Sequence, residues 1–245
     1  MMAQPVLVLK NLTKWFGGLQ VINDVNLSFR PGELRCIIGP NGAGKTTLFN
    51  MITGRVKPDQ GQIVFEGRDI TRLKPYEISR TGIALKFQVP TVFDELTIHE
   101  NLNIAARGPS PASRAVGKKS VPARIEEVME VVHLAGREEE VAGTLSHGER
   151  QWLEIGMVLA YRPKVMLLDE PTAGMSTQET IETSHIIRTI SHDTTTIVIE
   201  HDIKFLREIA ENVTVIHQGA VIAEGTFQEV SAIDLVRDIY LGRRG

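Results

Sequence analysis

Gly39-Pro40-Asn41-Gly42-Ala43-Gly44-Lys45-Thr46-Thr47 is the stretch that decides the fold of this 245-residue chain. It fits the pattern G-x-x-x-x-G-K-[ST], and it follows an apolar, strand-like run at residues 34–38. Glycines let successive backbone N–H groups curl around a phosphate, while the Lys45 ammonium can reach the β- and γ-phosphates and the Thr46 hydroxyl can ligate Mg²⁺. A helix expected over 45–53 points its positive dipole end at the same anion. The stretch therefore predicts a phosphate-binding loop for a nucleotide.

The plainer interpretation is a glycine turn that merely enters a helix. The strand-like run before the loop and the helix-ending Gly54 after it disfavour that interpretation. The loop alone does not choose among kinases, GTPases and transport ATPases.

Composition and charge restrict the class of protein. The chain is 42% hydrophobic and 23% charged, which is typical of a globular protein with a full core. A net charge of −3 gives no electrostatic reason to expect nucleic acid as a partner. The apolar runs are far shorter than the ~20 residues that cross a bilayer, and the stretch at 6–9 has no basic residue before it, as a secretory signal would. We expect a cytoplasmic protein without a membrane span.

Cysteine and histidine usage argues against disulfide and zinc chemistry. Cys36 is the single cysteine, and its place in the apolar run predicts a small buried residue rather than a nucleophile. The seven histidines show no paired ligand spacing, so no structural zinc is expected.

Hydrophobic periodicity divides the chain into three stretches. The first is rich in strands, the second is helical from about 97 to 136 around an interruption at 108–122, and the third alternates strands with helices. The expected strands are 6–16, 21–29, 34–38, 62–66, 164–168, 194–200, 213–217 and 221–224, and the expected later helices are 176–191, 203–210 and 227–241. Strands joined by helices imply a mostly parallel sheet, so the fold class is α/β.

Two carboxylates end a buried-strand pattern at Val165-Met166-Leu167-Leu168-Asp169-Glu170. A parallel sheet presents groups to a ligand beyond the carboxyl ends of its strands. Asp169 is placed to hold Mg²⁺, and Glu170 can orient the attacking water or accept its proton. Without the phosphate loop, an acidic pair after a strand would more often be a solvated turn.

A capping box opens the helix that precedes this strand. Ser146 suits the N-cap position and Glu149 follows three residues later. The surrounding Leu145-Ser146-His147-Gly148-Glu149, lying between the phosphate loop and the acidic strand, resembles the signature of the ABC transporter ATPases. That resemblance covers nearly the whole chain, because Gln88 matches the family's Q-loop glutamine and His201 its switch histidine. Phe16 matches the aromatic residue that stacks on adenine, with Trp15 as the alternative.

The resemblance implies a fold and a set of roles. It implies one nucleotide-binding domain over 1–245: a P-loop NTPase core with a mostly parallel sheet, an N-terminal antiparallel β subdomain, and a helical signature subdomain at about 89–162. It further implies ATP and Mg²⁺ as cofactors, Glu170, His201, Lys45 and Gln88 as catalytic residues, and Thr46, Gln88 and Asp169 as metal ligands. The implied nucleotide contacts are Phe16, Gly39, Asn41, Gly42, Ala43, Gly44, Lys45, Thr46 and Thr47, completed by Ser146 and Gly148 of a facing cassette.

Two departures from the family pattern affect these roles. His147 and Glu149 stand where the commonest signature has glycine and glutamine, whereas Ser146 and Gly148 are kept. The segment at 171–176 lacks the leucine-aspartate usual in the family's D-loop. Equivalence of the two nucleotide sites of a dimer is therefore not assumed.

The resemblance extends to one branch of importers. The stretches at 87–93, 96–102 and 239–242 resemble the branched-chain amino acid and amide uptake branch. Within it, the stretches at 32–39, 145–157 and 173–175 are most similar to ATP-binding subunits of urea transporters. The expected cargo is urea or a related short amide, with branched-chain amino acids as the alternative.

The same resemblance implies the partners and the location. They are two transmembrane permease subunits, a second ATP-binding subunit (a different chain is favoured, a second copy possible) and, indirectly, an extracytoplasmic substrate-binding protein. A groove around 88–101 is expected to receive a permease helix at the cytoplasmic face of the inner membrane. The rival interpretations are a non-transport ABC ATPase, a switch that binds ATP without turnover and, last, a P-loop kinase of small molecules.

Overall fold

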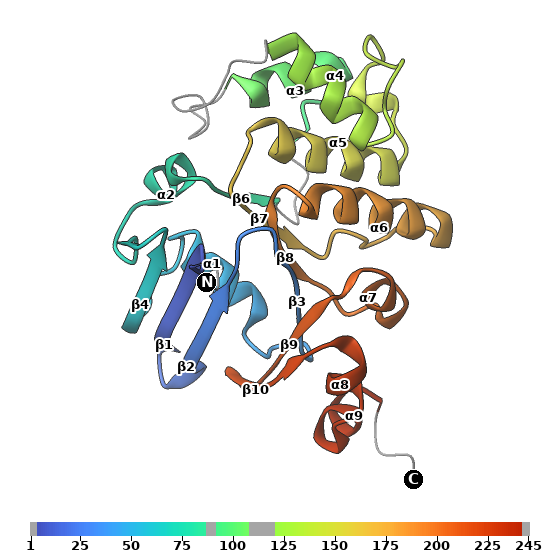
Figure 1. Cartoon of the computed structure of the whole chain (residues 1–245). Helices are drawn as coiled ribbons and strands as arrows, with labels where there is room; N and C mark the ends of the chain where they lie inside the picture. Colours follow the sequence, from blue (N-terminus) through green and yellow to red (C-terminus); the bar gives the residue numbers. More distant parts are fainter. Residues whose placement is uncertain (1–3, 87–91, 108–120, 242–245) are drawn as a thin grey trace.

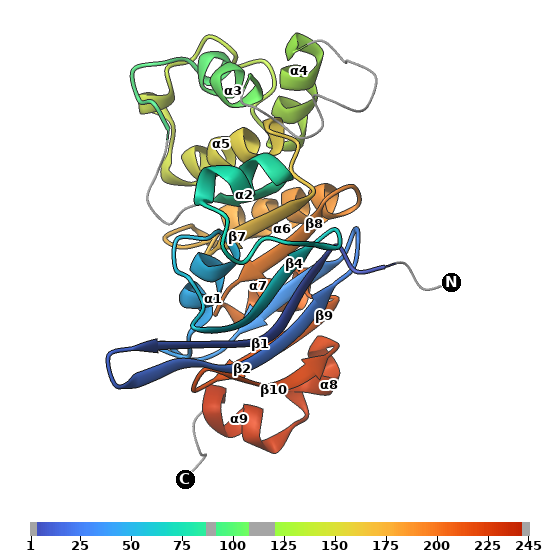
Figure 2. The same cartoon turned by 90° about the vertical axis from the view of Figure 1, so that its left-hand side faces the viewer.

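The computed structural model describes residues 4–86, 92–107 and 121–241, with side chains up to residue 237. Its N-terminal part is a four-stranded antiparallel sheet in the order β2-β1-β4-β5. The strands are β1 Leu7–Phe16, β2 Leu19–Phe29, β4 Gln60–Phe65 and the short β5 Arg68–Asp69. Figure 2 shows β1, β2 and β4 side by side. Gly17 adopts a φ of 58°, which suits it to the turn between β1 and β2.

The second sheet has six strands in the order β10-β9-β3-β8-β7-β6. They are β3 Leu34–Ile38, β6 Ile83–Lys86, β7 Val165–Asp169, β8 Thr195–Ile199, β9 Asn212–His217 and β10 Ala220–Gly225. Neighbouring strands are parallel except for β9 and β10, which form a hairpin. The expected mostly parallel sheet is therefore confirmed, and β6 is a strand that the sequence pattern did not reveal.

The helices fall into groups around this sheet. The elements are α1 Lys45–Ile52, α2 Pro75–Thr81, α3 Ile98–Ala106, α4 Val121–Val131, the 3₁₀ turn Ala142–Thr144, α5 His147–Ala160, α6 Thr177–Ser191, α7 Ile203–Ile209, α8 Phe227–Ser231 and α9 Asp234–Leu241. In Figure 1, α3, α4 and α5 lie together at the top, and α6 lies between α5 and the sheet. Across the described ranges, no helix combines the length and apolar character needed to span a membrane.

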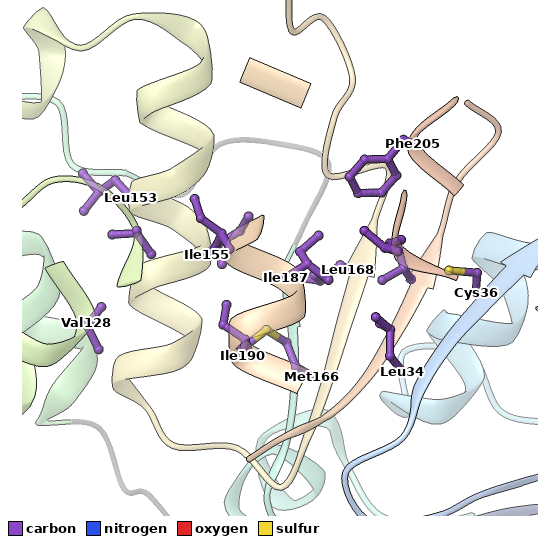
Figure 3. Close-up of a cluster of buried hydrophobic side chains, with 14 of the residues drawn as sticks. Leu34, Cys36, Val128, Leu153, Ile155, Met166, Leu168, Ile187, Ile190 and Phe205 are labelled. Carbon is purple, nitrogen blue, oxygen red and sulfur yellow. The ribbon is translucent and has the colours of Figure 1, made fainter. Parts of the chain in front are cut away.

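The core consists of two clusters because successive residues of the buried strands point to opposite faces. Met166 and Leu168 of β7 belong to the cluster beneath α5, α6 and α7, drawn in Figure 3. Val165 and Leu167 belong to the cluster shared with α1 and the antiparallel sheet. Cys36 is fully buried in the first cluster, and this burial raises the pKa of its thiol far above the ordinary range. The expectation of a buried cysteine is confirmed.

The single terminal helix expected over 227–241 is wrong, since the chain forms α8 and α9 with a break at residues 232–233. Val230 and Val236 are both buried in the first cluster. One straight helix would place residues six apart on different faces, so the break lets both side chains reach the core. The missed α2 begins at Pro75, a residue favoured in the first turn of a helix.

Candidate nucleotide-binding and hydrolysis site

The phosphate-binding loop, residues 39–47, connects the carboxyl end of β3 to α1, as the sequence predicts. Gly42 and Gly44 have φ values of 79° and 104°, a region that costs glycine little. The Lys45 ammonium lies inside the loop and donates hydrogen bonds to the carbonyl oxygens of Gly39 at 2.6 Å and Pro40 at 3.1 Å. Burial lowers the pKa of Lys45, and the nearby Glu170 and Asp169 carboxylates oppose that effect.

The glycines of the loop differ in whether a side chain would fit at their positions. A Cβ on Gly39 would collide with the main-chain oxygen of Ile216 in β9, and one on Gly44 would lie 2.7 Å from the main-chain oxygen of Val21. A Cβ on Gly42 would meet open space. Ala43 is buried, Thr47 is half-buried, and Asn41, Gly42 and Thr46 are exposed. The loop thus packs on both sheets and presents its remaining face to a ligand.

Asp169 ends β7 beside the loop. Its carboxylate is almost buried and accepts a hydrogen bond from the Thr46 side chain. Burial, reinforced by the charge of Glu170, raises the pKa of Asp169 from 3.8 to about 6, while Lys45 and Lys86 act in the opposite direction. The Thr46 hydroxyl and the Asp169 carboxylate, two of the expected magnesium ligands, therefore lie together. The raised pKa indicates that Lys45 and Lys86 do not fully offset the cost of burying the Asp169 charge.

Glu170 and His201 lie together at the ends of adjacent strands. His201 Nδ1 is 3.4 Å from Glu170 Oε1, and the Glu170 backbone N–H donates to Ile199 at 2.9 Å. Glu170 has a φ of 47°, an uncommon value for a residue other than glycine. Its side chain is one-quarter exposed and that of His201 is 61% exposed. Both expected catalytic side chains can therefore be reached from solvent at the carboxyl edge of the parallel sheet.

Glu200 was not predicted as a site residue, yet it organises this edge. Its carboxylate is 1% exposed and accepts from the hydroxyl and the backbone N–H of Thr172 and from the backbone N–H of His201 at 2.9 Å. It thereby joins the segment after Glu170 to the segment that carries His201. A carboxylate at the end of a fully buried strand was the available sequence signal.

A second unpredicted feature is a buried ion pair between the sheet and the signature helix. Lys86, the last residue of β6, places its ammonium 3.2 Å from Glu154 Oε2 of α5, with both side chains at most 3% exposed. Burial lowers the pKa of Lys86, and Glu154, Asp169 and Glu200 counteract this. Gln88, two residues further along, lies outside the described residues.

The signature segment, residues 145–149, opens α5 with the predicted capping box. The Ser146 hydroxyl accepts from the Glu149 backbone N–H at 3.2 Å, and the Ser146 backbone N–H donates to the Glu149 carboxylate at 2.8 Å. Arg137 pairs with Glu149, and His147 Nε2 lies 2.9 Å from the Ala173 carbonyl oxygen. The described hydrogen bonds of Ser146 and Gly148 do not reach the phosphate loop of the same chain.

The adenine candidates lie at the tip of the antiparallel sheet. Phe16 ends β1 and is 48% exposed, and the Lys14 ammonium is 5.3 Å from the centre of its ring. Trp15 is half-buried, and its backbone N–H donates to Asp59 at 2.7 Å. A larger fraction of Phe16 than of Trp15 is therefore exposed for stacking.

Comparisons with known proteins agree with this geometry. The model of the ABC transporter family matches residues 22–173. The chain is 37% identical, over 98% of its length and 99% of the relative, to BraF of Pseudomonas aeruginosa, a high-affinity branched-chain amino acid transport ATP-binding protein. Two solved structures are similar to it, each over 98% of this chain and 100% of the other. One is a nucleotide-free ATP-binding cassette from an ABC transporter, with a TM-score of 0.85 and 31% identity. The other is the ADP conformation of MJ1267, an ATP-binding cassette of an ABC transporter, with a TM-score of 0.85 and 32% identity.

This chain belongs to the ABC transporter family. It has the ABC ATPase fold, which confirms the expected fold class, and it is an ATP-hydrolysing cassette of the type found in branched-chain amino acid transport ATP-binding proteins.

Proposed function

We propose that the chain is the ATP-hydrolysing subunit of an ABC importer, organised as one nucleotide-binding domain with α3, α4 and α5 in its helical subdomain. One observation carries the chemical part: Thr46, Lys45, Asp169, Glu170 and His201 meet at the carboxyl edge of a parallel sheet. Sites in such sheets lie at this edge because the strands end there together.

The loop, Lys45 and Phe16 hold ATP. Backbone N–H groups of residues 39–47 and the α1 dipole attract the phosphates, and Lys45 exchanges its two carbonyl partners for phosphate oxygens. Glu170 orients the attacking water and accepts its proton, while His201, beside it, stabilises charge on the γ-phosphate.

The site fits Mg²⁺, because the Asp169 carboxylate and the Thr46 hydroxyl are hydrogen-bonded neighbours and hard oxygen ligands. A divalent cation there would also compensate the buried charge of Asp169. Gln88 is the third proposed ligand. When bound, Mg²⁺ would neutralise charge on the β- and γ-phosphates.

A facing cassette completes the site in this proposal. Ser146 and Gly148 would bind the γ-phosphate held by the loop of the partner, so ATP would join two cassettes and hydrolysis would release them. ATP favours the closed pair because it contacts both halves there. The partner is proposed to be a different chain, with a second copy as the alternative.

A permease helix is proposed to dock around residues 88–101, next to a groove between α2, β6, α3 and α5 that residues 92–101, the described part of this stretch, do not line. The lining of the groove includes Tyr76, Ile78, Leu85, Ala105, Met157 and Tyr161. Tyr76 is 55% exposed, and Phe93, in the segment that leads into α3, is 50% exposed. Val92 packs against the core, and residues 88–91 lie outside the described residues. Among residues 92–101, Phe93 is the exposed large apolar side chain.

The proposed cargo is urea or a short amide, and the proposed place of action is the cytoplasmic face of the inner membrane. The stretches at 32–39, 145–157 and 173–175 support urea, whereas the name of the BraF relative supports branched-chain amino acids. A substrate-binding protein would deliver the cargo to two permeases, and this chain would not contact it.

Glu170→Gln tests the chemistry. The amide cannot accept a proton, so we expect ATP binding to persist, turnover to fall below a few percent of wild type, and a closed pair to accumulate. Turnover within a few-fold of wild type would refute the role of Glu170. Stoichiometric ATP binding without turnover by the wild-type chain would instead favour the ATP-dependent switch.

Parallel uptake of labelled urea and labelled leucine tests the cargo, in source cells that carry either the wild-type chain or Lys45→Ala. Loss of urea uptake alone is the expected result. Loss of leucine uptake alone would instead support branched-chain amino acids as the cargo. Unchanged uptake of both would favour another cargo or a non-transport ABC ATPase.

A further inference from the structure

Glu179, in the first turn of α6, lies on the signature segment of the same chain. The Gly148 backbone N–H donates to its carboxylate, and the Ser146 hydroxyl lies 3.4 Å from Oε1. A Cβ on Gly148 would collide with this same oxygen, so the carboxylate lies directly over the glycine. These two donors are the ones proposed above to bind the γ-phosphate of a partner's ATP.

The other carboxylate oxygen has a local task. Oε2 accepts from the backbone N–H and the hydroxyl of Ser176, both at 2.8 Å, in the capping box of α6. Glu229 occupies the matching position in the capping box of α8, and its described hydrogen bonds all go to Thr226. Glu229 shows that a glutamate can cap a helix with no other described side-chain hydrogen bond. The contact of Glu179 with the signature segment is therefore separate from its capping role.

An anion at the N-terminus of α5 is electrostatically favourable, because unpaired backbone N–H groups and the helix dipole point at it. Glu179 supplies that anion from within the chain. A carboxylate and a phosphate cannot share the same two donors, and their negative charges repel.

We propose that the Glu179 carboxylate occupies, within its own chain, the two donors that bind the partner's γ-phosphate. ATP must displace this carboxylate from Ser146 and Gly148 before two cassettes can close. Glu179 is thus a positioning residue that raises the ATP concentration needed for closure and keeps the signature segment ordered until then. This inference rests on the proposed function of Ser146 and Gly148.

The consequence for affinity can be bounded. Apparent affinity falls in proportion to the fraction of molecules whose donors are free. If Glu179 covers the donors in about nine molecules out of ten, its removal raises apparent affinity for the trans phosphate roughly tenfold.

The first test measures ATP-dependent dimerisation by light scattering in Glu170→Gln, Glu170→Gln/Glu179→Ala and Glu170→Gln/Glu229→Ala chains. We expect the Glu179 variant to close at roughly three- to tenfold lower ATP concentration, and the Glu229 variant to match its parent. Both substitutions remove the same kind of helix cap, so a purely structural effect would weaken closure in either. Equal or higher ATP demand in the Glu179 variant overturns the inference while the proposed function stands.

The second test needs no dimer. In the ATP-free chain, hydrogen exchange of the Gly148 amide is expected to accelerate in Glu179→Ala and to stay unchanged in Glu229→Ala. An unchanged rate in Glu179→Ala overturns the inference directly. A Glu170→Gln parent that shows the protected Gly148 amide but never dimerises would instead exclude pairing between two copies of this chain, as expected if the partner is a different chain. The comparison of Gly148 exchange in Glu179→Ala and Glu229→Ala then decides the inference.

Discussion

Lys86→Met should lower the stability of this chain more than a surface substitution does, because it removes the cation that faces the buried Glu154 carboxylate. Lys86 Nζ lies 3.2 Å from Glu154 Oε2, and the two side chains are 2% and 3% exposed. Removing one partner of a buried ion pair costs about 3–5 kcal/mol. In a chain of this size, each kcal/mol shifts the melting temperature by about 2–4 °C, so we expect a fall of roughly 6–20 °C.

Thermal unfolding followed by circular dichroism at pH 7.5 measures this effect. Lys164→Met is the matched control, since it breaks an ion pair with Glu66 at 2.6 Å whose side chains are 47% and 45% exposed. Such exposed pairs contribute about 0–1 kcal/mol. The double variant Lys86→Met/Glu154→Leu removes both charges and should recover most of the lost stability. A Lys86→Met chain no less stable than Lys164→Met, or a double variant no better than the single one, would refute the reasoning.

Three further predictions follow from the site. Asp169→Asn should abolish Mg²⁺-dependent hydrolysis, yet in chelator it should stabilise the chain by up to about 3 kcal/mol at pH 7.5. Because the folded chain raises the pKa of Asp169 from 3.8 to about 6, the wild-type carboxyl group is neutral and costs no stability below pH 4, and it destabilises the fold once the pH rises through 6. Melting curves should therefore show the gain at pH 7.5 and little of it at pH 4. His201→Ala should lower kcat by roughly 100-fold or more with little change in ATP affinity; an unchanged kcat would remove His201 from the site. Gly39→Ala should weaken ATP binding and lower the melting temperature because its Cβ collides with Ile216, whereas Gly18→Ala, with no atom near its Cβ, should do neither.

Features within one short segment could be predicted because their physics is local. The phosphate loop, the capping box at Ser146 and Glu149, and the acidic end of β7 each depend on residues a few positions apart, and each lies where the pattern placed it. The break between α8 and α9 escaped prediction, because its cause is the burial of Val230 and Val236 in a common core, which only the packing of the chain reveals.

The sequence by itself determined the α/β class, the loop that faces a nucleotide and the carboxylates that follow a buried strand. The tertiary structure alone decided that Lys86 pairs with Glu154, that Glu200 joins the segments carrying Glu170 and His201, and that Glu179 covers Gly148. The contacts Lys86–Glu154, Glu200–Thr172 and Glu179–Gly148 join elements far apart in the chain, and single charged residues carry no periodic signal. Their partners are fixed only when the sheet order and the packing of α5 and α6 bring the side chains together.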